Sequence, residues 1–193
     1  KIKSTDENIP QVLKYIGDAI VRADKVIVGL LDFSSLSNFV MEPGDLREPL
    51  ESALILLKNE FDRYQIKAVK VFEQGLPLVR MDKNRMEQVF VNILLNAVQA
   101  MPQGGTITVR VSVKGSDGRR KVVGLEIEDT GIGVPAHIRD RIFSPFLTTR
   151  RSSGGSGLGL VVCRHILQMH GGEIAVENRK DSPGARVTIL LKA

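Results

Sequence analysis

The stretch "VNILLNAVQAM" (residues 91–101) is an apolar run with two amides set four positions apart. Because an α-helix completes a turn in about 3.6 residues, Asn92 and Asn96 lie on one face of a helix. On a helical wheel at about 100° per residue, the polar positions of 85–101 share an arc of about 80°. These positions are Arg85, Gln88, Asn92, Asn96 and Gln99. Apart from Glu87, the remainder of the wheel is apolar or small, so the pattern predicts a buried helix with one narrow polar stripe.

This polar stripe has two interpretations. Burying an amide without a partner costs about 1–3 kcal/mol, which favours a stripe that lines a cavity or contacts a polar ligand. The alternative is a strip that faces solvent and whose amides bond only to water. If the stripe lines a site, an asparagine carbonyl is a hard oxygen ligand that Mg²⁺ accepts beside waters and substrate phosphates. A phosphate-bearing ligand is therefore expected there.

Two glycine-rich loops carry further polar groups. "EDTGIGVP" (128–135) follows a predicted strand and places Asp129, a pure acceptor, beside glycines that let the backbone approach a flat ligand. An exocyclic amine would fit this carboxylate. "SSGGSGLGLVV" (152–162) leads into a helix start, where free backbone N–H groups and the helix dipole favour phosphate oxygens. Either loop alone could be a simple connection, but together with the stripe they indicate a binding site.

Two common nucleotide fingerprints do not describe these loops. The residues Gly131, Gly133 and Ala136 formally match G-x-G-x-x-G/A. However, Pro135 and the short "AHIRDRIF" after it do not provide the long crossover helix of a βαβ unit. The pattern G-x-x-x-x-G-K-[ST] is absent from the sequence, which excludes a P-loop.

Hydrophobic periodicity predicts an α+β fold, a two-layer α/β sandwich in which a mixed sheet packs on about three helices. The predicted helices cover 46–64, 82–101 (capped by Asp82) and 157–170, and the predicted strands cover 66–73, 105–115, 121–130, 172–180 and 184–192. One long helix precedes this block, because apolar residues from Ile9 to Leu30 alternate in steps of four and three. These apolar residues would pack equally well against a partner helix or against the chain's own domain. The segment "EPGD" (42–45) ends the predicted helix.

Composition limits the remaining possibilities. With 193 residues, 42% hydrophobic and 25% charged, the chain fits one compact domain with an appendage. Neither a membrane-spanning stretch nor a signal peptide is visible, so a cytoplasmic location is expected. The net charge of +5 is dispersed and no RNA-binding signature accompanies it, so no nucleic-acid partner is expected. Cys163 is expected to pack as a small hydrophobe, and the three histidines lack metal-ligand spacing.

Taken in order, these motifs resemble those of the ATP-binding catalytic domain of bacterial sensor histidine kinases, in the GHKL superfamily with its Bergerat-type fold. "NILLNA" (92–97) resembles the N box, "DTGIG" (129–133) the first glycine box, "FSPF" (143–146) the F box and "GSGLGL" (155–160) the second glycine box. "MHGG" (169–172) and "GARVTILL" (184–191) also lie where the family has similar residues. The resemblance covers roughly residues 45–193, and several motifs in one order are far more specific than any one of them.

The resemblance implies ATP and Mg²⁺ as cofactors and a role for each site residue. Asn96 would be the metal ligand, with Asn92 on metal or phosphates and Gln99 beside them. Asp129, flanked by Gly131 and Gly133, would accept from the adenine amino group, and Ile132 would pack on the base. The remaining implied contacts are backbone N–H groups to phosphates from Gly157, Leu158, Gly159 and Leu160, and a water-mediated adenine contact from Thr188. Leu147 to Gly154 would form a lid, in which Arg150 either reaches the γ-phosphate or is simply solvated.

The implied activity is that of a protein-histidine kinase in two-component signal transduction, which donates the γ-phosphoryl group of Mg-ATP to a histidine on a dimerisation domain. ATP-hydrolysing relatives place a general-base glutamate at the position of Asn92, and an amide cannot take a proton. Transfer is therefore expected over hydrolysis. The alternatives are a nucleotide-binding regulatory module and a GHKL ATPase without phosphotransfer.

The chain also departs from its family at the acceptor. Residues 1–40 resemble the second helix of a dimerisation hairpin and 41–193 the ATP-binding catalytic domain, but the H-E-x-x-N-P pattern of the acceptor helix is absent. His137, His165 and His170 all follow the N box, whereas the acceptor should precede it. We therefore expect a fragment of a longer, homodimeric kinase that does not accumulate phosphohistidine alone. Its expected partners are a hairpin helix bearing the histidine and a response regulator.

Overall fold

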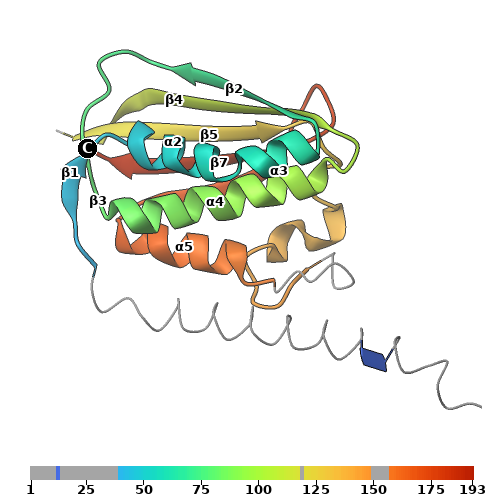
Figure 1. The fold of residues 1–193 in the computed structure, drawn as a ribbon. Helices are drawn as coiled ribbons and strands as arrows, with labels where there is room; N and C mark the ends of the chain where they lie inside the picture. Colours follow the sequence, from blue (N-terminus) through green and yellow to red (C-terminus); the bar gives the residue numbers. More distant parts are fainter. Residues whose placement is uncertain (1–11, 14–38, 118–119, 149–156) are drawn as a thin grey trace, which may run out of the picture.

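The structure is a computed structural model that describes residues 12–13, 39–117, 120–148 and 157–193. A five-stranded sheet in the order β2-β4-β5-β7-β6 forms one layer, and the helices cover one of its faces (Figure 1). The strands are β2 (Ile66–Phe72), β4 (Gly105–Asp117), β5 (Arg120–Asp129), β6 (Glu173–Asn178) and β7 (Ala185–Lys192). The helices are α2 (Arg47–Leu56), α3 (Lys58–Arg63), α4 (Lys83–Ala100) and α5 (Gly159–Met169), with a 3-10 helix at Ala136–Arg141. The predicted two-layer α+β architecture is confirmed.

Helix α4 runs through the middle of the helical layer. Asp82 caps its start, because one carboxylate oxygen accepts from the backbone N–H of Arg85 at 3.0 Å. Its apolar face is fully buried against the sheet and the neighbouring helices, through residues that include Met86, Phe90 and Leu94. Burial of this face stabilises α4 far more than its helix propensity does, since two asparagines lie in its interior.

Alternation along the strands gives the sheet an inner and an outer face. Leu125, Ile127 and Asp129 of β5 point to the helices and are all buried. The intervening Glu126 and Glu128 lie on the outer face, which no helix covers in Figure 1. In the described sheet β2 and β4 run parallel, and the other neighbouring strands run antiparallel.

Two details differ from the sequence prediction. The helix predicted over 46–64 is divided at Leu57 into α2 and α3. A two-stranded antiparallel sheet of β1 (Glu42–Gly44) and β3 (Val79–Met81) was not predicted, because strands of three residues carry no readable period. Most of the helix predicted over Ile9 to Leu30 lies outside the described residues. Across the ranges that are described, no helix has the length and apolarity needed to cross a membrane.

Candidate functional site

The polar stripe of α4 lies at the surface, while eight residues on the opposite side of the helix are buried. Asn92 is half-buried, and Asn96 and Gln99 are exposed. At the start of the stripe the guanidinium of Arg85 donates to Gln88 Oε1 at 3.2 Å. The amides therefore emerge from an otherwise apolar helix along one line, as the sequence predicts.

Asp129 lies beyond one end of this stripe, at the end of β5. It is buried, with 6% of its surface exposed. Its Oδ1 accepts from the backbone N–H of Gly131 at 2.8 Å and of Ala185 at 3.2 Å. The first of these bonds closes a tight turn that directs the following loop across the end of α4.

The loop after Asp129 packs directly on the last residues of α4. The backbone N–H of Ile132 donates to Ala100 O at 3.2 Å. A Cβ on Gly131 would lie 2.5 Å from the same carbonyl oxygen, so only glycine allows this approach. Ile132 itself is 77% exposed. It thus offers an apolar side chain beside Asp129 at the surface.

The other glycine-rich segment meets the stripe near its middle. Helix α5 begins at Gly159, and a Cβ added to this glycine would lie 3.7 Å from Asn92 Oδ1. Leu158, at the N-cap, makes no side-chain capping hydrogen bond. Gly157 packs against the backbone of Phe146 and Leu147, at 2.6–2.8 Å from the position of a Cβ. The F box and the second glycine box are therefore in contact beside the amide stripe.

Cys163 is buried in the helical layer beside Asn92. Burial raises the pKa of the thiol to about 12, opposed by a hydrogen bond with the Asn92 side chain. The thiol also lies 3.7 Å from Val89 O. Cys163 is therefore protonated and packed, as predicted.

Asn92 and Ala100 are eight residues apart on α4, which corresponds to about 12 Å along the helix axis. One loop contacts the helix at each of these positions. The structure thus brings together the N box, both glycine boxes and the F box along one edge of the helical layer. A carboxylate lies at one end, amides lie between, and a helix start with backbone N–H groups lies at the other end. This arrangement suits an elongated ligand with an amine-bearing base and an anionic tail.

Thr188 is not part of this arrangement, which corrects the sequence prediction. Thr188 lies opposite Glu126 of β5, and its neighbours Val187 and Ile189 pack toward the core. The alternation of a strand therefore directs Thr188 to the outer face, away from Asp129. Ala185 takes its place beside the carboxylate, through its backbone N–H. Arg150 and most of the predicted lid (149–154) lie outside the described residues.

Two residues beside the site, Asn178 and Arg179, were not predicted from the sequence. Asn178 bonds to the loop that carries Ile132, and the guanidinium of Arg179 donates to Asp129 O at 3.3 Å. These residues are far from Asp129 in sequence, and no motif marks them. Strand pairing alone brings them close.

His170 is a buried histidine whose two ring nitrogens both have hydrogen-bond partners. Its Nδ1 lies 2.8 Å from Ile166 O and its Nε2 accepts from the backbone N–H of Asp82 at 2.9 Å. The ring also packs edge-to-face on Phe39, at 4.7 Å between centroids. Burial lowers the pKa of His170, although the Ile166 carbonyl and Asp82 oppose this effect. The ring is therefore neutral, with its proton on Nδ1.

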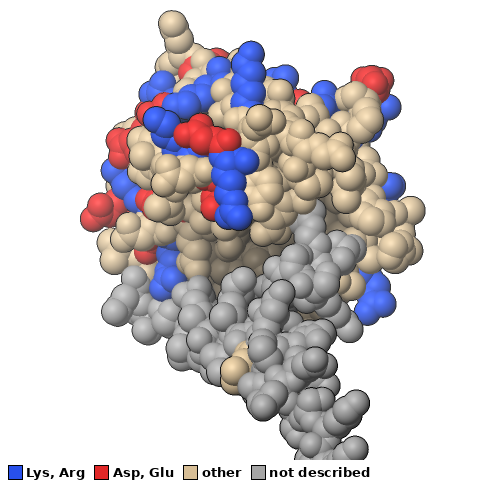
Figure 2. All heavy atoms as spheres, turned by 45° about the vertical axis from the view of Figure 1, so that its right-hand side comes forward, with Lys and Arg blue, Asp and Glu red and all other residues tan. Residues whose placement is uncertain are grey.

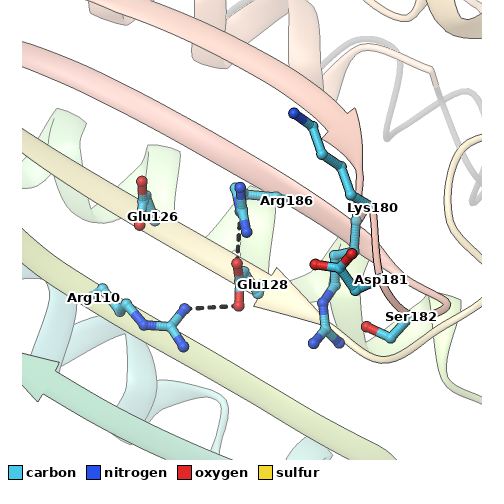
Figure 3. Close-up of a pocket in the computed structure, with 8 residues that line it drawn as sticks. Arg110, Glu126, Glu128, Lys180, Asp181, Ser182 and Arg186 are labelled. Atoms are coloured by element: carbon cyan, nitrogen blue, oxygen red, sulfur yellow. Dashed lines mark hydrogen bonds and ion pairs between the residues drawn. The ribbon is translucent and has the colours of Figure 1, made fainter.

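A separate polar hollow of about 330 Å³ lies on the outer face of the sheet (Figure 3). Glu128 accepts from Arg110 at 2.7 Å and from Arg186 at 2.6 Å, and the turn at Lys180 to Ser182 forms the rim. The Glu128 carboxylate is therefore largely satisfied by the guanidinium groups of Arg110 and Arg186. This hollow lies on the opposite side of the sheet from the amide stripe and contributes nothing to it.

Charges of both signs are interleaved over the upper part of the face shown in Figure 2, with a broad uncharged area beside them. No basic stripe is visible among the side chains described there. Within the described ranges, no group of three or more His, Cys, Asp or Glu residues could hold a metal ion. A metal at the site would therefore depend on amides and on the ligand itself.

Comparison with known proteins places the chain in a family. Residues 81–193 match the family described as histidine kinase-, DNA gyrase B- and HSP90-like ATPase, and the chain belongs to this family. Among curated proteins, the sensor histidine kinase ZraS of Escherichia coli is 32% identical over 170 residues, which is 88% of this chain. The chain spans 35% of the length of that relative.

Solved structures of histidine kinases share the fold. The nucleotide-free catalytic domain of the histidine kinase ThkA is 27% identical, with a TM-score of 0.67, over 79% of this chain and 95% of that one. Full-length ShkA in complex with AMPPNP is 25% identical, with a TM-score of 0.74, over 100% of this chain and 40% of that one. The resemblance inferred from the motifs is therefore confirmed.

Proposed function

We propose that the domain binds Mg-ATP along the edge formed by α4, the Asp129 loop and the start of α5, and donates the γ-phosphoryl group to a protein histidine in two-component signalling. One observation carries this proposal: helix α4, which bears the amide stripe, meets one glycine-rich loop at Ala100 and the other at Asn92. The family supports an ATP site, and the related ShkA was solved with AMPPNP.

At the base end, Asp129 accepts the adenine amino group and Ile132 covers the ring. The Asp129 carboxylate is held in place by two backbone N–H groups, so its orientation is set before any ligand arrives. The exposed Ile132 side chain provides apolar area for a flat ring. Together they select a base that bears an exocyclic amine.

At the phosphate end, Asn92 and Asn96 provide neutral amide oxygens, and residues 157–160 provide backbone N–H groups at a helix start. This donor set fits Mg²⁺, which binds few protein oxygens and keeps waters and substrate phosphates as its other ligands. We assign Asn96 as the protein ligand, with Gln99 beside it. Bound Mg²⁺ neutralises phosphate charge, and the chain's own residues orient the tail beside α5.

The site favours transfer over hydrolysis. Asn92 lies where hydrolysing relatives have a glutamate, and its amide has no basic site with which to activate water. Transfer then depends on positioning an attacking imidazole rather than on acid–base chemistry in this domain.

The attacking histidine would come from a dimerisation hairpin, of which residues 1–40 resemble the second helix. The domain proper then covers 41–193, with Arg150 in the lid as a γ-phosphate contact. We further propose a response regulator as the downstream partner, a homodimer in the full-length kinase, and a cytoplasmic site of action where ATP is available.

Calorimetric titration of ATP with and without Mg²⁺ tests the binding site. We expect Mg²⁺ to strengthen ATP binding to the unaltered domain. In Asn96→Ala, the factor by which Mg²⁺ increases the ATP affinity should be at least about tenfold smaller. Asn84→Ala is the matched control, because Asn84 is an exposed asparagine in the first turn of the same helix. Equal Mg²⁺ effects in all three proteins would contradict the assignment of Asn96.

Phosphotransfer is tested by incubating the chain with γ-labelled ATP, alone and with a donated hairpin that carries the acceptor histidine. We expect acid-labile, alkali-stable label on the hairpin only. Steady phosphate release without label would instead support the ATPase alternative. Binding of ATP with neither outcome would support a regulatory module.

A further inference from the structure

Asn178, the last residue of β6, bonds with its side chain to both backbone groups of Val134. Its Oδ1 accepts from Val134 N at 2.7 Å, and its Nδ2 donates to Val134 O at 2.9 Å. A side-chain amide carries the same donor and acceptor pair as a peptide group, so Asn178 binds Val134 as a neighbouring strand would. The two residues are 44 positions apart in sequence.

These two bonds hold the far end of the loop that presents Ile132. The near end is held by Gly131 N to Asp129 and by Ile132 N to Ala100 O. Between the two ends, Gly133 has a φ of +71°, and a Cβ there would lie 2.9 Å from Asn178 Oδ1. Glycine at 133 therefore permits both the left-handed backbone and the close approach of Asn178.

The same hairpin also holds Asp129. Arg179 donates from its guanidinium to Asp129 O at 3.3 Å and from its backbone N–H to Gly184 O at 3.0 Å. Ala185 N then donates to the Asp129 carboxylate. The turn between β6 and β7 thus contacts Asp129 at the end of β5, while Asn178 contacts the loop that carries Ile132.

We propose that Asn178 is a positioning residue for the adenine end of the nucleotide site: it fixes residues 131–134 so that Ile132 lies over the base bound by Asp129. This inference depends on the proposed function. Because Asn178 acts through Val134 at the base end of the site, its loss weakens base binding and leaves the Mg²⁺ effect intact.

ADP titrations separate the two ends of the site. Without Mg²⁺, Asn178→Ala is expected to bind ADP about tenfold more weakly, because two hydrogen bonds that order the loop are lost. Asn178→Asp should be at least as weak, since a carboxylate cannot donate to Val134 O. In both variants the ratio of ADP affinities with and without Mg²⁺ should equal that of the unaltered domain. Glu173→Gln, at the exposed start of β6, is the matched control.

Amide hydrogen exchange of the nucleotide-free domain provides a second measurement, which remains decisive if Asn178→Ala folds poorly. Asn178→Asp should exchange the Val134 and Gly133 amides at least about tenfold faster, with β5 protection unchanged. ADP affinity equal to that of the unaltered domain, or a reduced Mg²⁺ ratio, would overturn the role of Asn178. Failure of the unaltered domain to bind ADP would instead reject the proposed nucleotide site itself.

Discussion

Asp129 shows how one residue can be structural and functional at once. Its Oδ1 accepts two backbone N–H groups, and its backbone carbonyl accepts from Arg179. These bonds come from the loop after β5 and from the β6–β7 hairpin, so the carboxylate joins two segments while remaining at the edge of the site. Its place in the site therefore follows from the same bonds that close the fold.

Asp129→Asn separates the structural role of Asp129 from its proposed role in binding the base. An amide oxygen can still accept from Gly131 and Ala185, so the fold should persist, but the adenine amine loses a charged acceptor. We expect ADP affinity to fall by about 10- to 100-fold. Fluorescence or calorimetric titration measures this change. Asp140→Asn, at an exposed position of the 3-10 helix, is the control and should bind ADP normally.

At the scale of elements, the start of α4 is held by residues just before β1 and just after α5. Asp82 Oδ2 accepts from Val40 N at 3.1 Å, while its other oxygen caps the helix. His170, directly after α5, accepts from Asp82 N and packs against Phe39. The start of α4, the end of α5 and the segment at 39–40 are therefore one hydrogen-bonded unit.

We expect His170 in this hydrogen-bonded unit to lower the free energy of unfolding in mild acid. Because burial lowers the pKa of His170 below 6.5, the unfolded chain takes up the proton first as pH falls. Stability should therefore decline below about pH 6.5 and continue to decline until the folded ring also protonates. Chemical denaturation between about pH 7 and about pH 5 measures the effect. His170→Gln should flatten the profile, whereas the exposed His137→Gln should leave it unchanged.

The sequence predicts an element well where its hydrophobic periodicity extends over many residues. It does not predict which residues strand pairing brings to the site. The eighteen residues of α4 and the strands from Gly105 to Asp129 carry clear periods of 3.6 and 2. The amide stripe and the Asp129 loop could therefore be predicted. Asn178 and the backbone of Ala185 could not, because only the register of β5, β6 and β7 brings them to the site. Thr188 lies away from the site because the alternation along β7, and not its place in the motif, decides which face its side chain takes.

Across the whole molecule, ion pairs cross the outer face of the sheet from strand to strand. Arg110 of β4, Glu128 of β5, Arg186 of β7 and Glu177 of β6 form a continuous series. Burial raises the pKa of Glu128, but the hydrogen bonds from Arg110 and Arg186 outweigh it, so the pKa lies below 4.5. The ionised form of Glu128 is therefore stabilised by folding.

Glu128→Gln tests this series at low pH. Because the folded pKa is lowered, the stabilisation is complete above about pH 4.5 and is lost as pH falls through the folded value. We expect the substitution to cost about 1–3 kcal/mol at neutral pH and to remove part of the decline in acid. Urea titrations at several pH values measure both. Glu60→Gln removes an exposed pair with Arg63 and should change stability little.

The parallel pairing of β2 with β4 sets a constraint on how the chain assembles. The hairpins β4–β5 and β6–β7 join strands that are adjacent in sequence, but β2 reaches its partner only after β3 and α4 have been traversed. Closing that long segment carries an entropic cost that local pairing avoids. The pairing of β5 with β7 closes a longer segment still, but β2 is in addition an edge strand held by β4 alone, so its amides should lose deuterium protection ahead of the central strands.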